Sequence, residues 1–260
     1  MGERILSSFF AFIGWKRCRR RLDELSYELI LFDADDTLFD YKKSEAYALS
    51  QAFANAGITV ASEVVDHYRT INQQLWNEYE QGNVSLDHLR SERFRRLFSA
   101  HGLAVEHPIE LFGQIYARHL GEGAFLIDDA EEICTRLRES GIRLAVITNG
   151  IKEVQLARIK RTSMDKHFEQ VIVSEDAGAQ KPSERIFEYA FEKLKVRERH
   201  NVLIVGDSLS SDIAGGIRYG IDTCWFNQMG IPNTSGLQPT YEIARLDELI
   251  KIAEGSHGSD

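Results

Sequence analysis

A short apolar run at residues 29–32 ends abruptly in the carboxylates Asp33, Asp35 and Asp36. An apolar run of this length between polar residues is typical of a strand buried on both faces of a parallel sheet. Ligands of such sheets bind beyond the carboxyl ends of the strands, which is where these carboxylates stand. The stretch 28–40 therefore predicts a central strand with a functional site at its end.

Asp33 and Asp35 are separated by one residue, so in continuing strand geometry both side chains point to the same side. Two carboxylates held so close repel each other unless a cation lies between them or one keeps its proton. A divalent cation such as Mg²⁺ takes one or two carboxylates together with substrate phosphate oxygens. A carboxylate can also be a nucleophile beside an acid/base partner. Either chemistry, or a plain acidic turn, accounts for this pair by itself.

The composition limits the classes of function. The 260 residues suffice for one large domain or for a core with an insertion. A net charge of -9 argues against a nucleic-acid-binding surface. Cys18, Cys134 and Cys224 lie far apart and form no Cys-x-x-Cys pair, which fits a protein of the reducing cytoplasm and neither a disulfide framework nor a zinc site. No apolar run reaches the ~20 residues of a membrane span.

The two ends of the chain differ from the rest. Residues 1–27 form an N-terminal extension, in which an apolar, aromatic patch precedes the basic run 16–21. A secretory signal has the opposite order, so we expect no export. Aromatic residues beside basic ones suit contact with a membrane surface. The simpler interpretation of residues 1–27 is a segment that is flexible, that packs on the domain, or that is not part of the natural protein. Residues 251–260 are predicted to be a flexible, Gly/Ser-rich tail.

Residues 41–121 predict a helical insertion. The stretch contains no convincing strand, and its apolar residues recur at helical spacing, as in Ile71, Leu75 and Tyr79. The glycines of the segment 121–123 predict a hinge that leads back to the main body.

Strands and helices alternate through the remaining chain. Repeated strand-helix units of this length imply a parallel sheet with helices on both faces, that is, an α/β fold with a Rossmann-like core. The expected strands are 143–147, 170–173, 201–205 and, as the final strand, 223–226. The expected helices are 128–139, 152–160, 183–194, 211–219 and 246–252.

Polar residues follow three of these strands. Thr148 and Asn149 come after the first, where a hydroxyl and an amide ahead of a helix can hold phosphate oxygens. Lys181 comes after the next and can neutralise charge that develops in a transition state. Asp207 and Asp212 follow the strand at 201–205 and, with the carboxylates after residue 32, form an oxygen-rich group suited to Mg²⁺.

Each of these motifs has a plainer interpretation when it stands alone: a turn, a solvated lysine or a helix cap. Together they place a nucleophile, a hydroxyl, a lysine and metal-binding carboxylates at the ends of successive strands. Chance rarely supplies this set, which is the one that phosphoryl transfer needs.

The set resembles the motifs of the haloacid dehalogenase-like (HAD) superfamily of phosphohydrolases. The matching stretches are Asp33-Ala34-Asp35-Asp36-Thr37, Thr148-Asn149, Lys181-Pro182 and Gly206-Asp207 through Asp212. The resemblance implies a HAD core built from residues 28–40 and 122–250. It also implies that 41–121 are a C1-type cap, which closes over the substrate.

Asp36 stands where most members of the superfamily carry glycine. In this the chain resembles the branch of pyrimidine 5′-nucleotidases that act on UMP, dUMP and dTMP. The stretches 72–79, 174–178, 215–216 and 223–225 are similar to that branch as well.

The resemblance implies Mg²⁺-dependent hydrolysis of a phosphate monoester through an aspartyl-phosphate. Asp33 is then the nucleophile, and Asp35 is the acid that protonates the leaving group and the base that activates water. Thr148 and Lys181 hold the transferring oxygens, with Asn149 as a further substrate-binding residue.

The implied Mg²⁺ ligands are Asp33, Asp207 and the backbone carbonyl of Asp35. Asp212 supports the ion directly or through water.

Specificity is expected to come from the insertion, because the core residues contact only phosphate. Trp76 can stack on a base or pack between cap and core, and Asn72 can contact a base edge or ribose. Arg93 can reach an anion, although it and the neighbouring arginines more simply form a solvated helix face.

Other functions stay open at this point. A dehalogenase would share the nucleophile but has no use for Mg²⁺ or for an acid at Asp35. A sugar-phosphate phosphatase or a phosphomutase of the same superfamily shares every core motif. A non-enzymatic binding module on this fold would be expected to have lost a catalytic residue, and none is missing. The expected partner is a small phosphate ester, and no oligomeric state is predicted.

Overall fold

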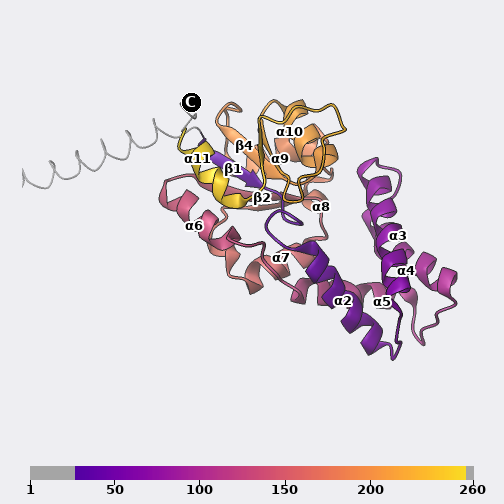
Figure 1. The fold of residues 1–260 in the computed structure, drawn as a ribbon. Coiled ribbons are helices and arrows are strands. Elements are labelled where there is room, and N and C mark those ends of the chain that lie inside the picture. The colour runs from indigo at the N-terminus through magenta and orange to yellow at the C-terminus, as the bar shows by residue number, and fades with distance from the viewer. Residues whose placement is uncertain (1–26, 256–260) are drawn as a thin grey trace, which may run out of the picture.

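The computed structural model describes residues 27–255, whose centre is a sheet of six parallel strands (Figure 1). The strands lie in the order β3-β2-β1-β4-β5-β6. β1 pairs with β2 on one side and with β4 on the other, so the chain winds outward first in one direction and then in the other. Their bounds are β1 Leu29–Phe32, β2 Arg143–Thr148, β3 Val171–Val173, β4 Val202–Gly206, β5 Asp222–Phe226 and β6 Tyr241–Ile243.

The side chains of β1 alternate between two apolar cores, one on each face of the sheet. Ile30 and Phe32 lie in the core covered by α6 (Ala130–Glu139), α7 (Lys152–Arg161) and α11 (Leu249–Ala253). Leu29 and Leu31 lie in the core covered by α9 (Glu184–Leu194) and α10 (Ala214–Tyr219). Because β1 is buried on both faces, its apolar sequence is continuous. The predicted Rossmann-like α/β fold is confirmed.

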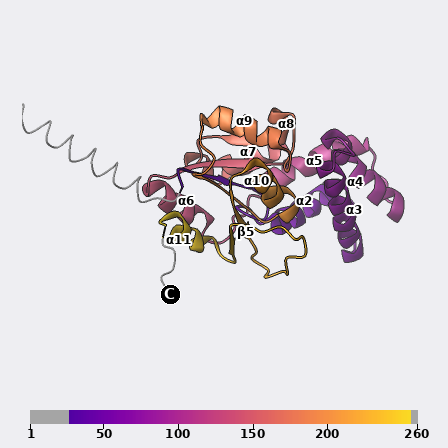
Figure 2. The same cartoon turned by 90° about the horizontal axis from the view of Figure 1, so that it is seen from above.

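Between β1 and β2 the chain forms a helical bundle, which lies beside the sheet (Figure 1, Figure 2). Its members are α2 (Tyr41–Asn55), α3 (Ser62–Glu80), α4 (Leu86–His101) and α5 (Ile109–Glu122). The apolar side chains of these helices form a core of their own, to which Val154 of α7 and Ile151, the residue before α7, contribute. The described residues 41–122 thus contain helices and no strand, as predicted. The division into core and cap remains a prediction.

Three details were not expected from the sequence. The segment 121–123, predicted as a hinge, is helical as far as Glu122, and Gly121 lets α5 pack closely on α7, since a Cβ there would lie 3.0 Å from Ala157 Cβ; the hinge itself stays a prediction. The strand ending at Phe226 is not the final one, because the short edge strand β6 pairs with it. The predicted flexible tail begins too early, because Lys251–Ala253 still belong to α11, where Ala253 is buried.

The predicted N-terminal extension and its membrane-surface alternative fall on residues 1–26, outside the described residues. Tyr27, predicted as the end of that extension, belongs to the core instead: it is buried, and its hydroxyl donates to Asp222 Oδ2 at 2.6 Å. Within residues 27–255 no helix combines the length and the apolar character needed to span a bilayer.

Candidate active site

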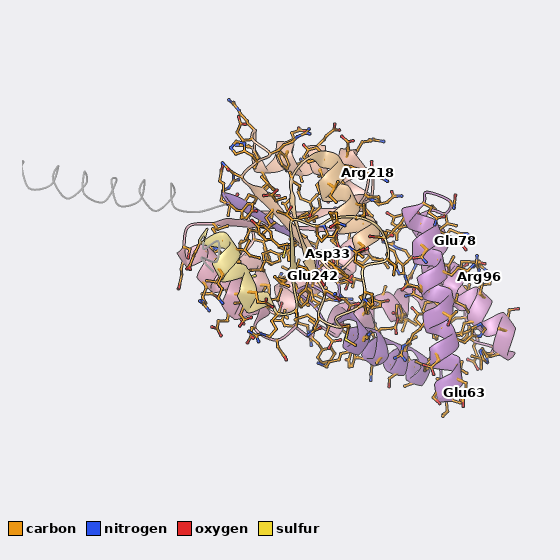
Figure 3. The ribbon with its side chains drawn as sticks, turned by 45° about the horizontal axis from the view of Figure 1, so that its top comes forward. Asp33, Glu63, Glu78, Arg96, Arg218 and Glu242 are labelled. Carbon is orange, nitrogen blue, oxygen red and sulfur yellow. The ribbon has the colours of Figure 1, made fainter. Side chains whose placement is uncertain are left out.

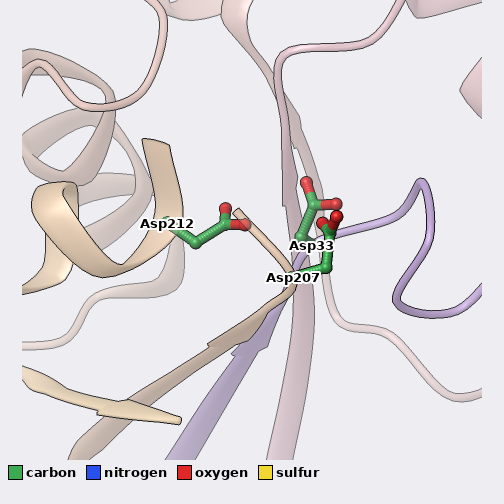
Figure 4. A group of neighbouring side chains, drawn as sticks. All are labelled: Asp33, Asp207 and Asp212. Carbon is green, nitrogen blue, oxygen red and sulfur yellow. The ribbon is translucent and has the colours of Figure 1, made fainter. Parts of the chain in front are cut away.

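Three carboxylates converge where β1 and β4 end, at the point where the winding of the sheet reverses (Figure 4). Asp33 follows β1 and Asp207 follows β4, while Asp212 comes from a π-helical turn, η2 (Leu209–Ile213), after β4. One oxygen of each lies within 4.8 Å of the others. Gly206 permits this approach, because a Cβ there would lie 2.2 Å from Asp212 Oδ2.

Lys181 is the cation of this group. Its Nζ donates to Asp33 Oδ1 at 2.6 Å, to Asp212 Oδ1 at 2.6 Å and to the carbonyl of Ile147 at 2.7 Å. These three contacts use all three ammonium hydrogens. The residue is 1% exposed, so the contacts are sheltered from water. One ammonium among three carboxylates leaves an excess of negative charge.

Burial, together with this excess of negative charge, shifts the pKa values of the carboxylates. Burial raises the pKa of Asp33 to about 8, against the opposing effect of Lys181. Burial, reinforced by Asp212 and Asp33, raises the pKa of Asp207 well above its usual range. A divalent cation with oxygen ligands would balance such a buried set, so the three carboxylates fit Mg²⁺.

Thr148 and Asn149 lie at the end of β2, beside β1. Thr148 Oγ1 accepts a hydrogen bond from Gly150 N at 3.0 Å, so its own hydroxyl hydrogen can be donated into the cavity that the residue lines. Asn149 Nδ2 donates to the carbonyl of Lys181 at 2.9 Å, and its Oδ1 accepts from Lys181 N at 2.8 Å. Asn149 therefore fixes the backbone of Lys181, whereas the sequence suggested only a contact with substrate.

The side chain of Asp35 contacts α7. Gln155 Nε2 donates to Asp35 Oδ2 at 2.6 Å, and Arg158 Nη1 pairs with Asp35 Oδ1. The carboxylate is therefore not among the three that gather at the strand ends, and the predicted metal contact through the Asp35 carbonyl remains a prediction. Gln155 and Arg158 were missed from the sequence, although polar residues on the buried face of a helix signal a specific partner.

One cavity of ≈ 220 Å³ brings the candidate residues together. In Figure 3 Asp33 lies among the side chains of the core, and Glu63, Glu78 and Arg96 mark the helical bundle beside it. Tyr41, Gln73 and Glu80, which the sequence did not single out, also line the cavity. The nine predicted residues along its wall are Asp33, Asp35, Asn72, Trp76, Thr148, Asn149, Lys181, Asp207 and Asp212.

Arg93 is fully buried within the helical bundle, which corrects the expectation of a solvated face or an anion contact. Its guanidinium lies 4.7 Å from the ring centre of Tyr116, so aromatic packing replaces water around it. Arg93 Nη1 donates to Asn72 Oδ1 at 3.3 Å, and Asn72 Nδ2 donates to Tyr41 Oη at 3.1 Å. Arg93 thus fixes the orientation of the Asn72 amide at the cavity.

Asp36 has a φ of 55°, in the left-handed region that favours glycine. Its Oδ1 accepts a hydrogen bond from Tyr41 N at 3.2 Å, at the start of α2. This bond ties the strand end to the first helix of the bundle and favours aspartate at a position where the backbone suits glycine.

A profile of the haloacid dehalogenase-like hydrolases matches residues 27–220. The chain belongs to this family. This HAD-like hydrolase is 38% identical to the HAD-hydrolase YfnB of Bacillus subtilis over 226 residues, which are 87% of this chain and 95% of YfnB. The crystal structure of YfnB bound to magnesium, which reveals interdomain movement, matches with a TM-score of 0.81 over 87% of this chain and 98% of that one.

Two further relatives of this HAD-like hydrolase are pyrimidine 5′-nucleotidases. PynA of Streptococcus pneumoniae is 33% identical over 86% of this chain and 94% of its own length. YjjG of Escherichia coli is 32% identical over 88% of this chain and 98% of its own length. The predictions of the HAD superfamily and of a hydrolytic enzyme are confirmed, and these relatives agree with a phosphoric monoester hydrolase close to the nucleotidase branch.

Proposed function

We propose that this HAD-like hydrolase is a Mg²⁺-dependent phosphatase that removes the 5′-phosphate from pyrimidine nucleoside monophosphates such as UMP, dUMP and dTMP. The observation that carries the proposal is the position of Lys181 Nζ, 2.6 Å from Asp33 Oδ1, at a cavity lined also by Thr148 and Asp207. A carboxylate held by an ammonium beside a hydroxyl donor suits attack on phosphorus.

In the first step, an oxygen of Asp33 forms a bond to phosphorus and the P–O ester bond breaks. The electron pair of the broken bond goes to the 5′-oxygen of the nucleoside, which takes the proton of Asp35. The positive charge of Lys181 and the hydroxyl of Thr148 stabilise the negative charge of the transferring oxygens. The products are phosphorylated Asp33 and the free nucleoside.

In the second step, water attacks phosphorus and gives a proton to Asp35 while the bond between phosphorus and Asp33 breaks. Inorganic phosphate leaves, Asp33 is again a carboxylate, and Asp35 has regained the proton that it donated. One water is consumed for each ester hydrolysed.

Asp33, Asp207 and Asp212 would hold the Mg²⁺, with the Asp35 carbonyl as a further ligand. When bound, the ion neutralises phosphate charge and helps to orient the ester for in-line attack. Trp225 Nε1 donates a hydrogen bond to the carbonyl of Asp207 at 2.8 Å, which fixes the backbone of this ligand at the end of β4.

Trp76 supports the choice of a nucleotide. Its ring packs edge-on against Tyr79 with centroids 5.7 Å apart, and the Tyr79 hydroxyl lies 3.1 Å from Ser174 Oγ in α8 (Ser174–Ala177). Supported in this way, Trp76 presents an aromatic surface to the cavity that can stack on a base. The pyrimidine specificity of PynA and YjjG supports the same choice.

Replacing Trp76 by alanine is expected to lower kcat/KM for UMP by about 10-fold or more, because base stacking contributes on the order of 1–3 kcal/mol. Ribose 5-phosphate lacks only the base, so its kcat/KM should not change. Steady-state kinetics with the two substrates measure the difference. An equal loss for both would assign Trp76 to packing between the bundle and the core.

Phosphate release from a panel of nucleoside monophosphates and sugar phosphates, with Mg²⁺ and with EDTA, tests the proposal as a whole. We expect UMP, dUMP and dTMP to be preferred and EDTA to abolish release. Preference for a sugar phosphate would contradict the choice of base and leave the chemistry in place. Full activity in EDTA would contradict the role of the metal, and no release from any ester would favour a binding module. The proposal includes a cytoplasmic location, for which the only support is the pattern of cysteines in the sequence.

A further inference from the structure

We propose that Arg158 and Gln155 are positioning residues that hold Asp35 in place for its acid/base task. The inference rests on the proposed function, because it assigns a partner to the acid/base of that reaction. The two residues stand one helical turn apart on α7, so their side chains reach the same carboxylate from one face of the helix.

The two donors engage both oxygens of Asp35. Arg158 Nη1 pairs with Oδ1, and Gln155 Nε2 donates to Oδ2 at 2.6 Å. A carboxylate has about four lone-pair sites, so two remain for a leaving group or a water. The side chain of Asp35 is 30% exposed and lines the cavity, so those sites can face a substrate.

Arg158 is itself firmly held. It is 0% exposed, and its Nε donates to the carbonyl of Leu120 in α5 at 3.1 Å. Its guanidinium also lies 5.8 Å from the ring centre of Phe39. A contact to α5 on one side and to Asp35 on the other fixes the plane of the guanidinium, and with it the plane of the carboxylate.

A buried guanidinium is destabilising unless a charged or polar partner compensates it. Among the described residues, Asp35 is the one carboxylate in ion-pair contact with Arg158. Gln155 is 1% exposed, and its amide likewise reaches Asp35. A single carboxylate at the edge of the cavity thus provides a partner for one nitrogen of each of these two buried side chains on α7.

A purely structural tie between α7 and the end of β1 would use the same contacts. The two roles differ in their effect on substrates with different leaving groups. The alkoxide that leaves from UMP needs a proton, whereas nitrophenolate, from p-nitrophenyl phosphate, leaves without one. Since kcat/KM includes only the steps up to departure of the leaving group, it isolates the acid task of Asp35.

The test compares wild type with Arg158→Met and Gln155→Leu, using Arg161→Met as the control, because Arg161 is exposed on the same helix. We expect Arg158→Met to lower kcat/KM by about 100-fold for UMP and by less than about 10-fold for p-nitrophenyl phosphate. Gln155→Leu should show the same imbalance to a smaller extent. Arg158→Lys should recover part of the loss, because lysine restores the charge without the planar fork.

An equal loss for both substrates, or no loss, would overturn the positioning role. If thermal denaturation shows that Arg158→Met does not fold, Gln155→Leu decides by the same comparison, because it removes no charge. Failure of the underlying reaction has a different signature: wild type itself would then release phosphate from neither substrate.

Discussion

Replacing Asp33 by asparagine is expected to abolish steady-state phosphate release, with a loss of about 10⁴-fold or more. The amide cannot form the bond to phosphorus on which both steps depend. The fold should survive, because Asp33 is a buried carboxylate whose pKa is raised to about 8 by burial, so a neutral side chain of the same shape is tolerated. Lys181 keeps its bond to Asp212. Phosphate release and a thermal melt measure the two effects separately.

The matched control for this variant is Asp165→Asn, because Asp165 is an exposed aspartate in the turn after α7. It should keep wild-type activity. Mass spectrometry of the Asp33→Asn protein excludes deamidation back to aspartate. Steady-state release within about 10-fold of wild type by an intact Asp33→Asn protein would rule Asp33 out as the nucleophile.

Lys181→Met is expected to weaken both the fold and the activity. The substitution leaves the buried carboxylates of Asp33 and Asp212 facing each other without their ammonium, and breaking a buried pair costs about 3–5 kcal/mol. The activity should also fall by about 10²–10³-fold, because a positive charge beside the developing phosphoryl charge is lost. Urea unfolding gives the change in stability, and phosphate release in the folded range gives the change in rate.

Lys152→Met serves as the comparison. Lys152 Nζ lies 2.6 Å from Asp176 Oδ1, but the two side chains are 42% and 37% exposed, so losing this pair should cost far less stability than losing Lys181. Equal, small losses of stability in the two lysine variants would contradict the claim that Lys181 compensates the buried carboxylates of Asp33 and Asp212.

Much of the α/β core could be predicted from the sequence, because its strands have a distinctive composition. Strands buried on both faces, such as β1 and β4, have continuous apolar sequences and stand out from their surroundings. Parallel strands end at the same edge of a sheet, so residues that follow successive strands meet there. This is why Asp33, Thr148 and Lys181, far apart in the chain, line one cavity.

Other features depend on packing that periodicity does not encode. β6 has three residues, and pairing with β5 alone distinguishes it from a loop. Arg93 and Arg158 are of a residue type that is usually solvated, yet both are fully buried, because aromatic rings surround one and a carboxylate pairs with the other. Gly121, predicted as part of a hinge, belongs to α5 and allows close contact between α5 and α7, which the glycine alone does not reveal.

The measurement that tests the central claim most directly is a rapid acid quench of the wild-type enzyme during turnover of an aryl phosphate with radiolabelled phosphorus, followed by peptide mapping. The aryl leaving group makes the first step fast, so the phosphorylated enzyme should accumulate. The account predicts label on the peptide that contains Asp33, lost on treatment with hydroxylamine as expected for an acyl phosphate. Label on another residue, or turnover with no labelled protein, would contradict it.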